Sequence, residues 1–145
     1  MKSWLIVAAL LGMQGAPAWA VLPVKPGAAP AQHPIIGKWT WTRSTNKCTE
    51  VYDYRPDGTL YVVSGAEQST TKYQIAGKPD AHGFYELKGR LVKTNGLRDC
   101  SDSPPGGPAK PYTLYIIFHH SEPQYLACQS AGLDHCFGPL TRVRP

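Results

Sequence analysis

From Ile35 onward, apolar residues alternate with polar ones in short runs that are separated by turn residues. No stretch keeps a helical periodicity for three turns, whereas a period of two is typical of strands that bury one face. The chain is therefore expected to be all-β. The runs that we expect to form strands are 35–42, 47–55, 59–64, 70–76, 84–93, 112–119 and 124–128.

The clearest local feature is the run 55–58, which reads Arg-Pro-Asp-Gly. Pro56 fixes φ at the value that a turn needs at its second position, and Gly58 tolerates a positive φ. This run therefore predicts a tight turn that joins the strands on either side into a hairpin.

Strands joined in sequence order would leave two unpaired edges, and closing the sheet into a barrel removes both. We therefore predict a small antiparallel up-and-down barrel formed by a single domain at 35–145. A flattened β-sandwich is the alternative. The segment 95–110, rich in Gly, Pro, Ser and Asp, is the one long loop of this domain, and such a loop is either functional or disordered.

Residues 1–20 have the pattern of a signal peptide. Lys2 precedes an apolar run at 4–13, and a small-residue site that ends at Ala20 predicts cleavage after that residue. The apolar run is too short to span a bilayer as a helix, so no transmembrane anchor is expected. Residues 21–34, rich in proline and alanine, are predicted to form a flexible leader. These features together predict a periplasmic or secreted protein.

The cysteines predict disulfides, because an even number in an exported chain is typical of a disulfide framework. They are Cys48, Cys100, Cys128 and Cys136. We favour Cys128–Cys136, whose short spacer can fold back, together with Cys48–Cys100. The Cys48–Cys100 bridge requires that residues 84–93 form one continuous strand. If Gly89, which can mark a bulge or a tight turn, reverses the chain, Cys100–Cys128 becomes the alternative.

The charge pattern argues against a nucleic-acid partner. The chain has 15 Lys and Arg against 10 Asp and Glu, a net charge of +5 at pH 7. These charges are spread along the sequence without a block of like charges, so we expect no nucleic-acid partner and only a weak preference for anionic surfaces.

No metal and no cofactor are expected. The adjacent His119 and His120 would point to opposite faces of a strand, so at most one of them could join His135 in a cluster. The cysteines are too far apart in sequence for a typical zinc site, whose ligands come in close pairs.

Strand parity selects the candidate ligand-binding residues. Glu50, Tyr52 and Tyr54 share one face of the run 47–55, and we expect that face to point into the barrel. A carboxylate inside a barrel must find a partner or take up a proton. The functional hypothesis is that Glu50 orients a ligand at the barrel mouth, with Tyr52, Tyr54 and Trp41 around it. The structural alternative is that Glu50 is solvated at the strand end or pairs with an arginine such as Arg142.

Catalysis is not expected. The serines lack a Gly-x-Ser-x-Gly context, the cysteines are predicted to be oxidised, and no pair of carboxylates has a spacing that suggests acid–base chemistry. We therefore predict that the protein is not an enzyme.

The motif Gly37-Lys38-Trp39, together with Arg142 or Arg144 near the chain end, resembles the signature of the calycin superfamily. In its lipocalin-type and avidin-type barrels, a Gly-x-Trp tryptophan closes one barrel end and an arginine from the last element packs across it. The resemblance thus implies structural roles for Trp39 and Arg142. The chain is shorter than a lipocalin and lacks a clear carboxy-terminal helix, and the further tryptophans of an avidin biotin site are absent.

The spacing from Trp39 through the predicted hairpin is similar to that of small bacterial lipocalin-like exported domains. This resemblance implies a binding module of the cell envelope with a lipocalin-like barrel, whose ligand the sequence does not identify. The alternative is a protein–protein role, such as an inhibitor of an envelope enzyme. The expected partner is accordingly a small molecule or an envelope protein.

Overall fold

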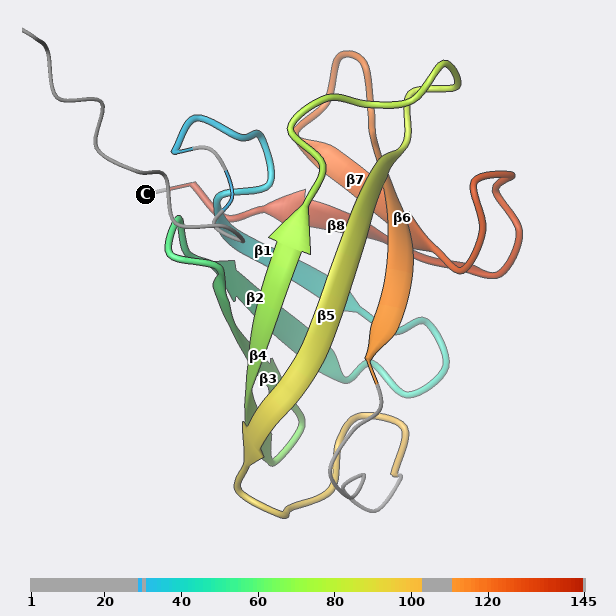
Figure 1. Ribbon diagram of the computed structural model, residues 1–145. Coiled ribbons are helices and arrows are strands. Elements are labelled where there is room, and N and C mark those ends of the chain that lie inside the picture. Colours follow the sequence, from blue (N-terminus) through green and yellow to red (C-terminus); the bar gives the residue numbers. More distant parts are fainter. Residues whose placement is uncertain (1–28, 30, 103–110, 145) are drawn as a thin grey trace, which may run out of the picture.

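The computed structural model describes residues 29, 31–102 and 111–144. Figure 1 shows the strands in chain order. They are β1 (Gly37–Thr42), β2 (Thr49–Tyr54), β3 (Thr59–Ser64), β4 (Glu67–Ile75), β5 (Tyr85–Thr94), β6 (Tyr112–Phe118), β7 (Gln124–Cys128) and β8 (Cys136–Arg142). Among the described residues, no helix has the length and apolar character needed to cross a membrane.

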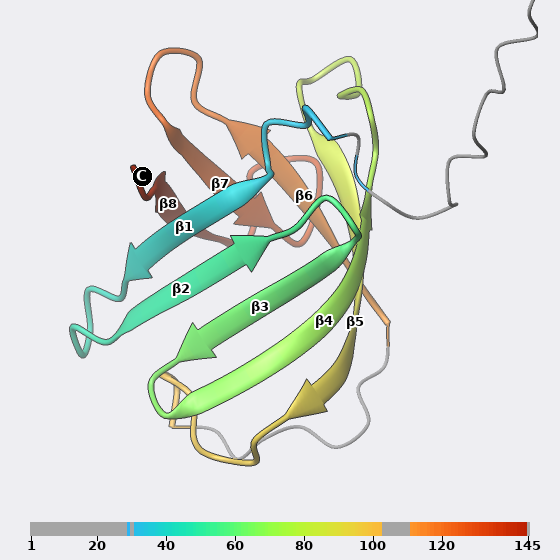
Figure 2. The same ribbon diagram turned by 90° about the vertical axis from the view of Figure 1, so that its left-hand side faces the viewer.

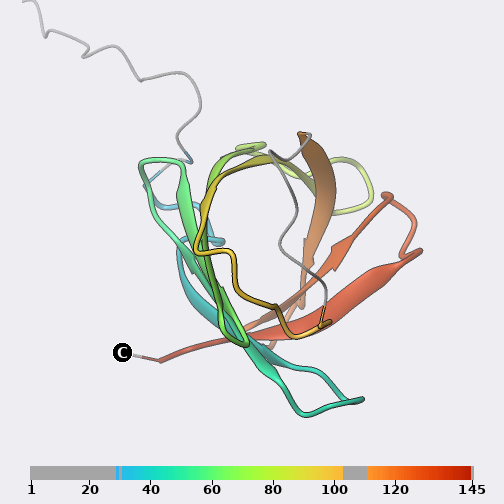
Figure 3. The same cartoon turned by 90° about the horizontal axis from the view of Figure 1, so that it is seen from below.

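Each strand pairs antiparallel with the next, and β8 pairs back with β1, so the sheet closes into an up-and-down barrel. Seen from below, the strands form a ring (Figure 3). The predicted all-β barrel is thus confirmed, and the flattened sandwich is wrong. The strand pattern missed β8, because Gly138 and Pro139 interrupt its alternation and a proline lacks the backbone donor that a ladder uses.

The turn at 55–58 sets the register between β2 and β3. Gly58 adopts a φ of 78°, and its N–H donates to the carbonyl oxygen of Arg55 over 3.2 Å. The pairing that follows brings Glu50 opposite Ser64. Both side chains point into the barrel, and both are buried.

Gly89 forms neither a bulge nor a turn. It lies within the continuous strand β5, where a Cβ atom would stand 2.3 Å from Cζ of Tyr112, so the tyrosine ring occupies the space that a side chain would need. The register shift between β4 and β5 lies elsewhere, between Thr70 and Thr71.

Because β5 does not reverse, the chain beyond it reaches the start of β2. The structure accordingly contains the two favoured disulfides. Cys48 and Cys100 have a Cα–Cα distance of 5.6 Å, and the second bridge joins Cys128 to Cys136. The Cys100–Cys128 alternative is therefore wrong.

The two ends of the barrel differ. We call the end with the loops 55–58, 76–84 and 119–123 the closed end, because large buried side chains fill it. Trp39 is 1% exposed there, and its indole N–H donates to the carbonyl oxygen of Ile35 over 2.7 Å. The Arg142 guanidinium lies 4.2 Å from the centre of the Trp39 ring, an arrangement consistent with a calycin-like barrel. We call the other end, with the loops 43–48, 95–111 and 129–135, the open end.

The end of the predicted leader packs against the closed end. Ala29 and His33 are buried, although the sequence assigned them to a flexible segment. His33 Nδ1 accepts a hydrogen bond from the N–H of Ile35 over 3.1 Å, so Nε2 carries the proton and donates to the carbonyl oxygen of Ala76 over 3.2 Å. Residues 21–28 and 30 of the leader, and residues 1–20, lie outside the described residues.

Candidate functional site

Glu50 is a buried carboxylate at the open end. It is 6% exposed, and its Oε1 accepts a hydrogen bond from the hydroxyl of Ser64 over 3.0 Å. The hydroxyl of Tyr52 donates to Oε2, and Nη1 of Arg43 lies 3.6 Å from Oε1. The charge is therefore compensated, as a carboxylate removed from water requires. The arginine partner is Arg43 and not Arg142, which lies at the closed end.

Tyr52 stays protonated in this environment. Burial, followed by the nearby Glu50 carboxylate, raises the pKa of the Tyr52 hydroxyl far above its usual value. The hydroxyl is thus a permanent hydrogen-bond donor to Glu50, and no proton exchange near neutral pH is available to it.

Ser64 connects Glu50 to the long loop. Its hydroxyl donates to Glu50 and accepts from the backbone N–H of Cys100 over 3.0 Å. On the other side of the disulfide loop, the amide of Asn46 donates to the carbonyl oxygen of Cys100 over 2.7 Å. Together with the Cys48–Cys100 bridge, these bonds fix the start of the long loop to the rim. With its hydroxyl engaged on both sides and its side chain buried, Ser64 is a structural link rather than a nucleophile.

Aromatic side chains from three strands adjoin this polar group. The Phe137 ring lies 5.4 Å from the Trp41 ring and 6.3 Å from the Tyr52 ring, centre to centre. The Arg43 guanidinium lies 5.5 Å from the centre of the Trp41 ring. All three aromatic residues are only partly buried, in contrast to the filled closed end. They present apolar surface beside a hydrogen-bonding carboxylate.

The structure places three of the four predicted ligand-binding residues together and separates the fourth. Glu50, Tyr52 and Trp41 meet at the open end. Tyr54 lies at the closed end, where its hydroxyl is 3.2 Å from that of Tyr125. It is buried, and burial raises its pKa, so it belongs to the core and not to the candidate site.

A pocket opens beside Trp41 where β1 and β8 part. These strands pair only at Trp39–Arg142 and Thr40–Thr141. Continuing that register would bring Thr42 opposite Pro139, which cannot donate to the ladder. The pocket at this seam has a volume of about 490 Å³. It is lined by Thr40, Trp41, Thr42, Ser44, Gly138, Pro139 and Thr141.

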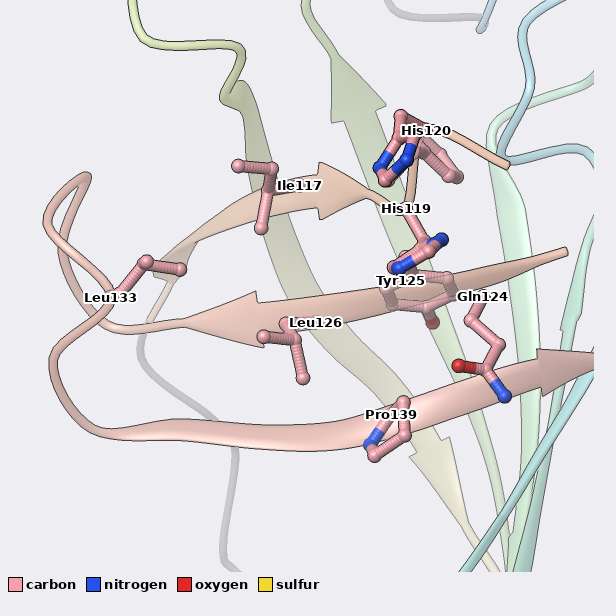
Figure 4. Close-up of a pocket in the computed structure, with 9 residues that line it drawn as sticks. Ile117, His119, His120, Gln124, Tyr125, Leu126, Leu133 and Pro139 are labelled. Carbon is pink, nitrogen blue, oxygen red and sulfur yellow. The ribbon is translucent and has the colours of Figure 1, made fainter. Parts of the chain in front are cut away.

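A second pocket, of about 470 Å³, lies on the outside of the barrel wall over β6, β7 and β8. Figure 4 shows Ile117, Leu126, Leu133 and Pro139 around it, with His119 and His120 toward one side. Among the described residues, no Lys, Arg, Asp or Glu lines it. This surface offers mainly apolar side chains to a partner.

The described residues do not bring together three His, Cys, Asp or Glu side chains that could hold a metal ion. The rings of His119 and His120 stack on one another at 4.7 Å, without a third ligand beside them in the described part of the chain.

Sequence reasoning missed Arg43, Ser64 and Phe137. Ser64 could have been found, because the turn at 55–58 fixes the register that sets it opposite Glu50. Phe137 was out of reach once β8 had been overlooked. Arg43 lies beyond the end of β1 in a loop, where strand parity makes no prediction.

Comparison with known proteins found no relative: no family model, no curated protein and no solved structure matches the chain.

Proposed function

We propose that this protein is an exported, non-enzymatic binding module of the cell envelope with a calycin-like barrel. Its signal-peptide pattern and two disulfides support export into an oxidising compartment. The Gly-x-Trp motif and the arginine above Trp39 support the calycin-like assignment.

The observation that carries the proposal is the position of Trp41. Its side chain lines the seam pocket and also contacts Phe137 in the partly accessible aromatic group at the open end. A ligand in the seam pocket therefore contacts Trp41, which links that pocket to the aromatic group beside Glu50. Four residues that line the seam pocket carry hydroxyls, so polar groups stand there beside the Trp41 ring. A few placed polar groups that fix the orientation of a ligand are typical of small-molecule sites.

The residues indicate the chemistry of the ligand. The rings of Trp41 and Phe137 favour a flat or apolar body. A carboxylate can accept about four hydrogen bonds, so the hydroxyls of Tyr52 and Ser64 and the nearby Arg43 leave capacity for a donor on the ligand. We therefore assign a small apolar or aromatic molecule that carries a hydrogen-bond donor.

Native mass spectrometry of protein purified from its own host tests the proposal. The wild type should retain a small-molecule mass, and Trp41→Ala and Glu50→Gln should lose it. Val63→Ala is the matched control, because Val63 is 42% exposed on the outer face of β3, whereas its neighbour Ser64 points inward to Glu50. Equal retention by all four proteins would place the ligand elsewhere.

The second candidate is a protein–protein role, which the uncharged apolar pocket over β6–β8 favours. In the same experiment, this role predicts a retained polypeptide mass. That mass should persist in Trp41→Ala and disappear in Leu126→Glu, which places a charge in the outer pocket.

A further inference from the structure

The outward face of β4 and β5 gathers cations that are scattered in the sequence. Thr71 and Tyr73 are buried, so Lys72 between them points outward, directly opposite Arg90 on β5. Beyond the register shift between Thr70 and Thr71, Lys93 lies opposite Thr70. Figure 2 shows β3, β4 and β5 side by side. We call their outer face the basic wall, and its exposed cations are Lys72, Lys88, Arg90 and Lys93.

This charge is only partly balanced within the described part of the chain: the Asp57 carboxylate lies near enough to Lys72 to interact with it, and Lys88 has an anionic partner. Lys88 pairs with Glu86 at 2.7 Å, but the ion pairs among the described residues do not include Lys72, Arg90 or Lys93. The Lys72 ammonium donates to the hydroxyl of Thr59 over 2.6 Å. Like charges directly opposite one another destabilise a sheet. An anionic partner would remove this repulsion.

Apolar side chains are exposed on the same wall. Val92 is 54% exposed on β5, and Tyr61 is 48% exposed on β3. Tyr61, Thr70 and Lys93 form one row across the three strands. Two more exposed apolar residues, Val63 and Leu97, follow toward the open end. The wall thus combines cations with apolar side chains.

We infer that the basic wall docks on an anionic phospholipid surface. Headgroup phosphates attract juxtaposed lysines and arginines. Val92 can enter the headgroup region, and tyrosine is favoured at the interface, as at Tyr61. A soluble polyanion would use the cations but would leave the apolar side chains in water. The wall is separate from the seam pocket, so docking does not depend on the ligand site.

Vesicle co-sedimentation tests this inference on the intact protein. Wild type should bind vesicles of phosphatidylcholine mixed with phosphatidylglycerol and should not bind phosphatidylcholine alone. The triple variant Lys72→Gln, Arg90→Gln, Lys93→Gln should bind the anionic vesicles on the order of 100-fold more weakly, at about tenfold or less per cation. It should still fold, because the change relieves like-charge repulsion, and thermal unfolding checks this.

The matched control removes the same charge from the closed end, with Lys38→Gln, Lys78→Gln and Arg144→Gln. It should weaken binding by less than tenfold, since those residues lie off the wall. If both triple variants lose vesicle binding equally, net charge alone explains the binding and the inference is wrong. Equal binding to neutral and anionic vesicles would overturn it too.

A third comparison separates the lipid surface from a soluble polyanion. Val92→Ser should weaken vesicle binding and leave any retention by polyphosphate or duplex DNA unchanged. If polyphosphate or DNA binds as tightly as the anionic vesicles, and Val92→Ser has no effect on either, the wall recognises a soluble polyanion and the lipid assignment is wrong.

Discussion

Trp39→Ala should remove the main support of the closed end. The side chain is 1% exposed, and its ring contacts Tyr125 at 4.7 Å, edge to face, and the Arg142 guanidinium at 4.2 Å. Truncating a buried tryptophan to alanine costs about 3–5 kcal/mol. The change also leaves the carbonyl oxygen of Ile35 without its indole donor, so we expect a loss near the upper end, about 5 kcal/mol.

Trp41→Ala is the matched control for this prediction. Trp41 lies two residues along the same strand and also faces inward, but it is only partly buried. Its truncation should cost at most about 2 kcal/mol, because less apolar surface returns to water. Urea unfolding of the oxidised proteins measures both values, with the free energies taken from midpoints at an unchanged m-value. If Trp39→Ala unfolds at the midpoint of Trp41→Ala, or of the wild type, the closed end is not the stabilising element.

Two further predictions concern the disulfides and a buried histidine. Replacing Cys48 and Cys100 by Ala should lower the free energy of unfolding by about 4 kcal/mol, and replacing Cys128 and Cys136 by about 2.5 kcal/mol, because the closed loops span 52 and 8 residues. Urea unfolding measures both values. A larger loss of stability on opening the short loop would contradict this prediction. Burial lowers the pKa of His33 below its usual 6.5, so the unfolded chain takes up the proton first and stability should fall as the pH drops through about 6.5. His33→Asn should abolish that part of the pH dependence, as urea unfolding at a series of pH values would show. If stability changes with pH in the same way in both proteins, His33 is not its source.

The sequence predicted the fold better than the site, for a physical reason. Alternation with a period of two identifies strands and their inward faces, and the turn at 55–58 fixes one register. From these, Glu50, Tyr52 and Trp41 were placed correctly on inward faces. Tyr54 shares that face but lies toward the other end of the barrel, and parity carries no information about position along the barrel axis.

The side chains that reach the site from a loop or from an irregular strand could not be predicted from strand parity. Arg43 reaches Glu50 from a loop, and its geometry depends on the hydrogen bond from the N–H of Arg43 to the carbonyl oxygen of Cys48. Phe137 belongs to a strand whose Gly138 and Pro139 break the alternation. Such contacts arise only when the barrel closes, because closure brings the last strand beside the first.

Closure also changes the meaning of the charge pattern. Along the sequence, Lys72 and Arg90 are well separated, and the positive charge looks evenly spread. In the barrel they are direct cross-strand neighbours, and Lys88 lies on the same face two residues before Arg90. Antiparallel pairing can concentrate charge that no window of the sequence reveals, so an even distribution along the chain does not argue against a charged face. For a β-barrel, the registers of neighbouring strands decide which surfaces attract an anionic partner.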